Sequence, residues 1–178
     1  MAAPITSLTD AYKGQTCWIV GSGPSLRWLK DTDIEDNGPV IAVNYATQIV
    51  ETLNLTNPVY SMQKDHHYFD SRYPTIAHIH ESGKDGWGDY VFDNPVDFDL
   101  AWNIPSLVSA TSIANLWGCT RCVYLCCDAV TKGDLLSMEG GEIIAKPMRA
   151  GYLIIGDWTK SVADKLGLPI EWRTPYPA

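Results

Sequence analysis

The chain has 178 residues, a length typical of one domain and short for two. Its 13 basic and 21 acidic side chains give a net charge of −8, which argues against a nucleic-acid backbone as the main partner. A composition of 46% hydrophobic and 11% aromatic residues is that of a folded core rather than of a disordered chain. A small anionic ligand held by backbone amides remains compatible with this charge.

Membrane and disulfide-rich classes are also disfavoured. No stretch reaches the roughly 20 apolar residues of a membrane span, and residues 1–10 lack the features of a signal peptide. The five cysteines are an odd number, and four of them crowd between Cys119 and Cys127. We therefore expect a cytoplasmic protein with buried free thiols. A zinc site is disfavoured, because neighbouring residues of a strand over 122–127 point to opposite faces.

Short apolar runs predict five β-strands, over 16–20, 39–43, 59–62, 122–127 and 170–172. The second ends at Asn44 and the fourth ends at Asp128. Strands that are apolar on both faces are typical of parallel sheets covered by helices.

Helical patterns lie between these runs, over 25–29, 45–53, 106–117 and 159–166. We expect Ser106 to cap the third of these helices, and Gly118 and Gly167 to end the third and fourth. The alternation predicts an α/β fold, a single Rossmann-like three-layer sandwich with a mainly parallel sheet, over 1–178.

Two stretches show neither pattern, and we expect an irregular loop over 68–103 and a short lid over 132–157. The loop interleaves acidic and aromatic side chains. This mixture suits sugar recognition, and it equally suits a packed loop with a solvated rim. The acidic members are Asp85, Asp89, Asp93, Asp97 and Asp99.

A glycine turn, Gly21-Ser22-Gly23-Pro24-Ser25, joins the first strand to a helix. Glycine lets a phosphate approach the backbone, and proline suits the first helical turn. A tight turn without a ligand is the alternative. A dinucleotide dehydrogenase is disfavoured, because Leu26 replaces the third glycine of its fingerprint and Asn44 replaces the acidic residue expected after the second strand.

Three segments resemble a known family. They are the run Ile-Val-Gly-Ser-Gly-Pro-Ser-Leu at 19–26 with Val43-Asn44, the serine-led helix and Asp-terminated strand of 106–128, and the closing helix and strand of 159–172. They are similar to the bacterial lipooligosaccharide sialyltransferases and to related archaeal pterin pyrophosphokinase-like proteins. The resemblance implies a glycosyltransferase that moves a sugar, sialic-acid-like or other, from a donor such as a CMP-sugar to an acceptor hydroxyl. It implies no required cofactor.

The resemblance also implies roles for single residues. The glycine turn would surround the nucleotide, Asn44 would contact the nucleotide or the sugar, and Ser106 would add donors for an anionic group at a helix N-terminus. Asp128 lies at a carboxyl end of the sheet, where it would face the ligand or cap a loop.

The sialyltransferases carry a histidine base after the Asp-terminated strand, whereas all four histidines of this chain precede that strand. His66 and His67, which follow the third strand, are the substitute candidates for the base, with Asp128 assisting. Two histidines in a surface loop are the alternative. His78 and His80 alternate along an extended segment, which alone is too little for a metal site.

Asp65 resembles the strand-closing Asp of the pterin relatives and is placed with the nucleotide-binding residues. Magnesium-dependent diphosphate transfer, with Asp65 and Asp128 holding Mg²⁺, is therefore an alternative to glycosyl transfer. A nucleotide-binding module without catalysis is another. The sequence is also compatible with a homo-oligomer in which a second subunit completes the site.

Overall fold

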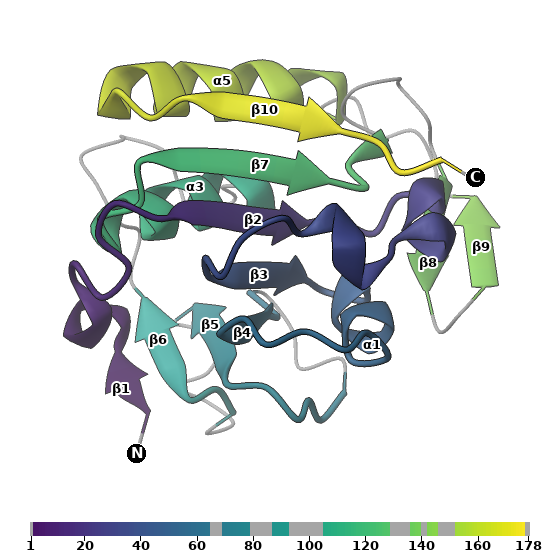
Figure 1. Ribbon diagram of the computed structural model, residues 1–178, viewed down its shortest axis with the longest axis horizontal. Coiled ribbons are helices and arrows are strands. Elements are labelled where there is room, and N and C mark those ends of the chain that lie inside the picture. Colours follow the sequence, from purple (N-terminus) through teal and green to yellow (C-terminus); the bar gives the residue numbers. More distant parts are fainter. Residues whose placement is uncertain are drawn as a thin grey trace.

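Figure 1 shows the chain as a computed structural model. The structure describes residues 2–64, 69–78, 87–92, 105–128, 136–139, 142–145 and 152–176. For 136–139, 142–145 and 152–153 it describes the backbone.

An eight-stranded sheet forms the centre of the fold. Its strands are β1 (Ala3–Pro4), β2 (Thr16–Val20), β3 (Val40–Val43), β4 (Val59–Met62), β5 (Thr75–His78), β6 (Tyr90–Phe92), β7 (Arg121–Leu125) and β10 (Ile170–Arg173). Their order in the sheet is β1-β6-β5-β4-β3-β2-β7-β10, and all neighbours are parallel. The predicted α/β fold with a parallel sheet is confirmed.

β2 lies inside the sheet, and the strands that follow it in the chain lie on both of its sides. The chain first runs outward through β3, β4, β5 and β6, and then returns to β7 and β10 on the other side of β2. The direction of winding therefore reverses between β2 and β7. Open α/β folds bind ligands at the carboxyl ends of the strands at such a switch point.

Helices cover both faces of the sheet (Figure 1). They are α1 (Ala46–Val50), α3 (Ser106–Leu116), α5 (Tyr152–Leu166) and the short 3-10 helices η1 (Ile5–Leu8), η2 (Pro24–Trp28) and η3 (Asp31–Asp33). α1 and η2 lie on one face, and α3 and α5 pack together on the other. An antiparallel hairpin of β8 (Leu136–Glu139) and β9 (Glu142–Ala145) stands apart from the sheet.

Strand β2 shows why its sequence is apolar on both faces. Ile19 belongs to the core cluster that contains Ile113 of α3, and its neighbour Trp18 belongs to the cluster that contains Leu26 of η2. None of these four side chains is more than 1% exposed. Burying one such side chain stabilises a fold by about 1.5–3 kcal/mol, so both layers depend on this strand.

The predicted strands over 16–20, 39–43, 59–62 and 170–172 are confirmed within one residue at each end. The fourth strand stops at Leu125 rather than at 127, because Cys126 has a φ of 59° and turns the chain. The stretch 68–103 was expected to be irregular, but it contains β5 and β6. These strands have four and three residues, too few for an alternating pattern to be recognised.

The stretch 132–157 likewise contains the β8–β9 hairpin and the start of α5. α5 begins seven residues before the predicted Thr159. The sequence does not predict this first part, because Gly156 and Asp157, which favour turns, lie inside the helix. The segment after the glycine turn is a 3-10 helix. Ser106 is not the cap of α3: Pro105 holds that position, and no side chain caps the helix.

Within the described ranges, no helix has the length and apolar character needed to cross a membrane.

Gly118 and Gly167 end α3 and α5 with φ values of 76° and 65°. A Cβ on Gly118 would lie 2.8 Å from Asp10 Oδ1 and 3.1 Å from Lys13 Cα, whereas a Cβ on Gly167 would meet nothing within 4 Å. Gly167→Ala should therefore cost only the left-handed backbone strain, about 1 kcal/mol. Gly118→Ala should cost about 1–3 kcal/mol more, because the N-terminal segment must shift. Urea unfolding of both variants measures the difference, and equal costs would contradict this packing.

Candidate functional site at the switch point

Two turns lie against each other at the carboxyl ends of β2 and β7. The N–H groups of Gly21 and Gly23 donate to the carbonyl oxygens of Leu125 and Cys126, both at 2.8 Å. Ser25 donates twice to Asp128 Oδ2, from its N–H at 2.8 Å and from its Oγ at 2.6 Å. Ser25 and Asp128 are buried, so these bonds are shielded from water. Asp128 thus holds the glycine turn in place.

The glycines of this turn are required by close packing. A Cβ on Gly23 would lie 2.4 Å from Asp128 Oδ2 and 2.6 Å from the carbonyl oxygen of Cys126, and a Cβ on Gly21 would lie 2.8 Å from Cys127 Sγ. The N–H groups of Gly21, Gly23 and Ser25 donate to Leu125 O, Cys126 O and Asp128 Oδ2. The side of Gly21 and Gly23 that lacks a side chain therefore faces the turn after β7, and their amides are bonded within the protein.

Asn44 follows β3 at the same edge of the sheet. Its φ of 51° is a left-handed conformation that asparagine tolerates better than most residues. The backbone around it is satisfied, since its N–H donates to Met62 O at 2.9 Å and its carbonyl accepts the Thr47 N–H at 3.1 Å. The half-buried side-chain amide makes no hydrogen bond to the part of the chain that the structure describes. A ligand at this edge can use both its donor and its acceptor.

Ser106 also lies at the carboxyl edge. The C-terminal end of α3 is at the opposite edge, where Leu116 O and Trp117 O accept the N–H groups of Asp10 and Tyr12. The N-terminus of α3 therefore points to the edge that carries Asn44, and α3 packs against β2 and β3. The first N–H groups of a helix have no acceptor within it, which suits an anion.

Strand β8 lies beside η2 at this edge (Figure 1). The described part of the predicted lid thus contains a hairpin whose first strand contacts the helix η2 that follows the glycines.

The candidate bases His66 and His67, together with Asp65, fall outside the described residues. The structure does describe Gln63 and Phe69 on either side of them. Gln63 Nε2 donates to Phe69 O at 3.0 Å, and Phe69 N donates to Gln63 Oε1 at 3.3 Å. This pair of bonds fixes Phe69 near the carboxyl end of β4. The sequence does not single out Gln63 as a residue that holds this segment, because it is one polar residue directly after an apolar run.

His78 does not lie in a surface loop. It ends β5, is 4% exposed and packs edge-on against Phe92, with 5.5 Å between the ring centroids. Its N–H donates to the carbonyl oxygen of Lys64, another buried residue beyond β4. His80 lies outside the described residues.

All five cysteines are free and buried, as the sequence predicts. Burial raises the pKa of the Cys126 thiol to about 12, and it also raises the pKa values of Cys17 and Cys127. These thiols are protonated at neutral pH, and a protonated thiol is neither a strong nucleophile nor a metal ligand.

Part of the acidic aromatic loop packs on the core, with the exposed Asp89 at its rim. Asp89 Oδ2 accepts the N–H of Thr75 at 2.8 Å, Tyr90 packs against Tyr60, and Phe92 is buried. This part of the loop fits the alternative of a packed loop with a solvated rim. The other acidic members, Asp85, Asp93, Asp97 and Asp99, lie outside the described residues.

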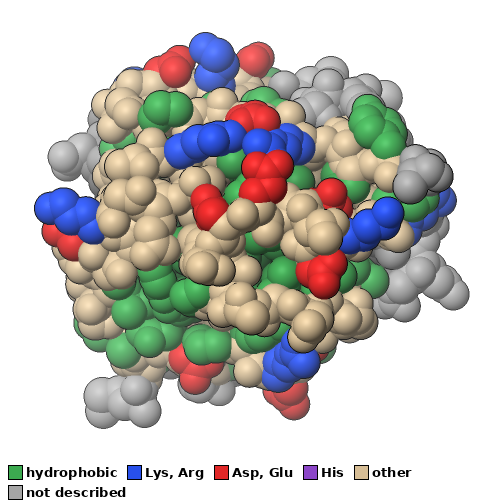
Figure 2. All heavy atoms as spheres, in the orientation of Figure 1, with side chains coloured by type: hydrophobic (Ala, Val, Ile, Leu, Met, Phe, Trp, Pro, Cys, Tyr) green, Lys and Arg blue, Asp and Glu red, His purple; other side chains and the backbone are tan. Residues whose placement is uncertain are grey.

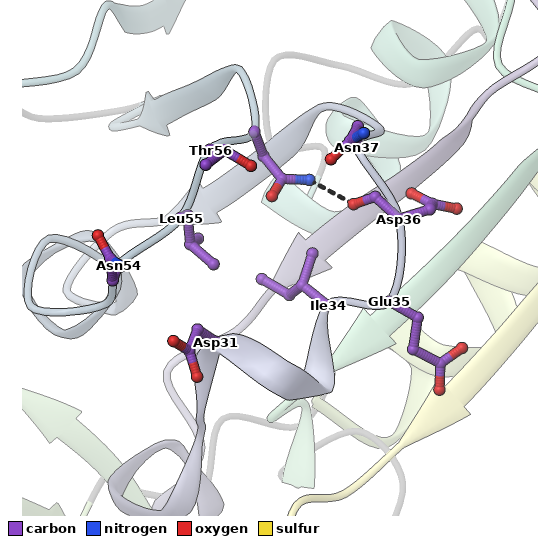
Figure 3. Close-up of a pocket in the computed structure, with 9 residues that line it drawn as sticks. Asp31, Ile34, Glu35, Asp36, Asn37, Asn54, Leu55 and Thr56 are labelled. Atoms are coloured by element: carbon purple, nitrogen blue, oxygen red, sulfur yellow. Dashed lines mark hydrogen bonds between the residues drawn. The ribbon is translucent and has the colours of Figure 1, made fainter.

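A shallow depression of about 140 Å³ lies at the opposite, amino edge of the sheet (Figure 3). The segments 31–37 and 54–57, which precede β3 and β4, line it. Asn57 Nδ2 joins them by donating to the carbonyl oxygens of Asp36 and Gly38, both at 2.7 Å. None of the predicted site residues borders this depression.

No protein-family model, curated protein or solved structure matches this chain.

The coupling between Ser25 and Asp128 is testable by unfolding. Asp128→Ala should cost about 3 kcal/mol, because two buried donors of Ser25 lose their acceptor. Asp128→Asn keeps an acceptor oxygen and should cost less. Ser25→Ala combined with Asp128→Ala should cost clearly less than the sum of the single changes. Additive costs in this double-mutant cycle would contradict the coupling.

Proposed function

We propose that the chain is a nucleotide-sugar-dependent glycosyltransferase of the sialyltransferase-like group, with its donor bound across the carboxyl ends of β2, β3 and β7. The observation that carries the proposal is the switch point between β2 and β7, where the glycine turn meets Asp128 and where Asn44 follows the neighbouring strand β3. Ligands of open α/β folds bind at this position.

In this proposal the glycine turn provides shape. Close packing against the turn after β7 fixes its backbone, and the donor would lie against the outer side of the glycine turn. Asp128 and Ser25 are positioning residues that hold the turn. The buried Asp128 carboxylate is already bonded to Ser25, which favours this role over proton transfer.

Asn44 and Ser106 supply the polar contacts. The amide of Asn44 and the hydroxyl and N–H of Ser106 would bind the donor phosphate, where negative charge grows as the bond to the anomeric carbon breaks. Donors that are already oriented lower the energy of that charge without reorganisation.

The proton of the acceptor goes to a histidine. As the acceptor oxygen forms its bond to the anomeric carbon, the nucleotide leaves with the electrons of the broken C–O bond, and His66 or His67 takes the hydroxyl proton. In the sequence both residues follow shortly after Met62, the last residue of β4, and β4 neighbours β3 in the sheet, which supports this assignment.

Calorimetric titration with CMP, UDP, GDP and ATP, each with and without Mg²⁺, tests the proposal. We expect one nucleotide to bind, and Asn44→Ala and Ser106→Ala each to weaken it by about tenfold, the equivalent of one lost hydrogen bond to a charged group. Asn54→Ala, in the depression at the amino edge, is the matched control and should leave the affinity unchanged.

The absence of binding tighter than millimolar for all four nucleotides would overturn the proposal. Donor hydrolysis separates the remaining functions: His66→Ala or His67→Ala should abolish it in a glycosyltransferase. Binding without hydrolysis in the wild-type chain would identify a non-catalytic module. Nucleotide binding that strictly requires Mg²⁺ and that Asp65→Ala abolishes would identify diphosphate transfer.

A further inference from the structure

We propose that the chain forms a two-fold symmetric homodimer in which β10 pairs antiparallel with β10 of a second copy. β10 is the last strand in the sheet order, and no other strand of the described ranges pairs with its outer side (Figure 1). A strand at a sheet edge is a template for pairing with another chain unless it is protected.

The open side of β10 carries regularly spaced backbone groups. The carbonyl oxygens of Pro169 and Arg173 accept the N–H groups of Cys122 and Cys126, at 2.9 and 3.3 Å, so these peptide groups face β7. Because peptide groups alternate along a strand, Ile170, Trp172 and Thr174 turn their N–H and C=O groups away from β7. These three residues present donors and acceptors that a second strand can satisfy.

The charges of β10 alternate in sign on one face. Glu171 and Arg173 are two residues apart, and Arg173 Nε donates to Glu171 Oε1 at 2.6 Å. Arg121 also binds Glu171, and Arg173 Nη1 binds Glu35 Oε1 at 2.7 Å. Figure 2 shows this band of blue and red side chains over the part of the surface where β10 lies.

These charges select one partner and one register. A two-fold axis at Trp172 places Glu171 opposite Arg173 of the second copy, and Arg173 opposite its Glu171, with Cβ atoms about 5 Å apart. Parallel pairing in equal register would instead set each charge beside its own kind. The edge is therefore complementary to itself in the antiparallel arrangement alone, which is the property of a two-fold interface.

The same register fits the other face of β10. Trp172 stacks on Tyr124 with 4.3 Å between ring centroids and remains half-buried. At the axis it lies beside Trp172 of the second copy. There the outward backbone groups of both tryptophans can exchange two hydrogen bonds at a Cα separation of about 5.5 Å.

Sedimentation equilibrium of the full chain, over about a hundredfold range of concentration, measures the dimer. We expect a monomer–dimer equilibrium that weakens with added salt, because the charge pairs at the edge are accessible to ions. A wild-type chain that remains monomeric over the whole range would overturn the proposal.

Thr174→Pro and Thr174→Val form a matched pair of variants. Proline removes the outward N–H and spares the ladder with β7, so its dissociation constant should rise by at least about tenfold, whereas the valine variant should match wild type. A dimer that survives Thr174→Pro unchanged would place the interface elsewhere and contradict the proposal. Thermal melting of both variants reports whether the fold is intact.

Charge reversal tests the register separately. Glu171→Arg sets like charges opposite each other and should weaken the dimer, whereas Glu171→Arg combined with Arg173→Glu restores opposite charges across the axis and should strengthen it again. Equal weakening by the single and the double change would contradict the antiparallel register. Thermal melting of both variants is the control, because Arg121 and Glu35 of the same chain also contact these two positions.

Discussion

The hydrogen bonds from Ser25 to the buried carboxylate of Asp128 join residues 103 positions apart in the chain. They close the switch point of the sheet, because one partner follows β2 and the other follows β7. The glycines depend on this contact, since a Cβ on Gly23 would overlap the carboxylate. The left-handed Cys126 belongs to the same arrangement, because it turns the chain so that Asp128 reaches Ser25.

This coupling explains how a site can be rigid before a ligand arrives. β2 is buried on both faces and ends in a turn in which the N–H groups of Gly21, Gly23 and Ser25 are bonded within the protein. In the proposed function a ligand at this edge would meet a fixed surface, and the adaptable contacts would come from Asn44 after β3 and Ser106 at the start of α3. Orienting donors in advance reduces the energetic cost of stabilising charge during a reaction. The same sheet ends at β10, whose alternating charges are self-complementary.

The sequence predicts the parts of the fold whose signal is local. Apolar runs bounded by turns locate β2, β3, β4, β7 and β10, and glycines locate the ends of α3 and α5. It does not predict β1, β5, β6 or the hairpin, because these strands have only two to four residues, too few for an alternating pattern to be recognised. It also suggests that the glycines are there for a phosphate, whereas their close contact with Asp128 and Cys126 emerges only when β2 and β7 lie side by side. Asp128 is recognisable as a strand end, but its partner Ser25 is not.

The most direct test of a nucleotide site at the switch point is a map of backbone amide shifts by NMR, recorded as the tightest-binding nucleotide is added. The account predicts that the largest changes fall on Ser22, Asn44, Ser106 and Leu107, at the carboxyl ends of β2 and β3 and at the start of α3. It predicts no change around Asn37 and Asn54, at the amino edge. Shifts concentrated at those two asparagines, with the switch point unperturbed, would contradict it.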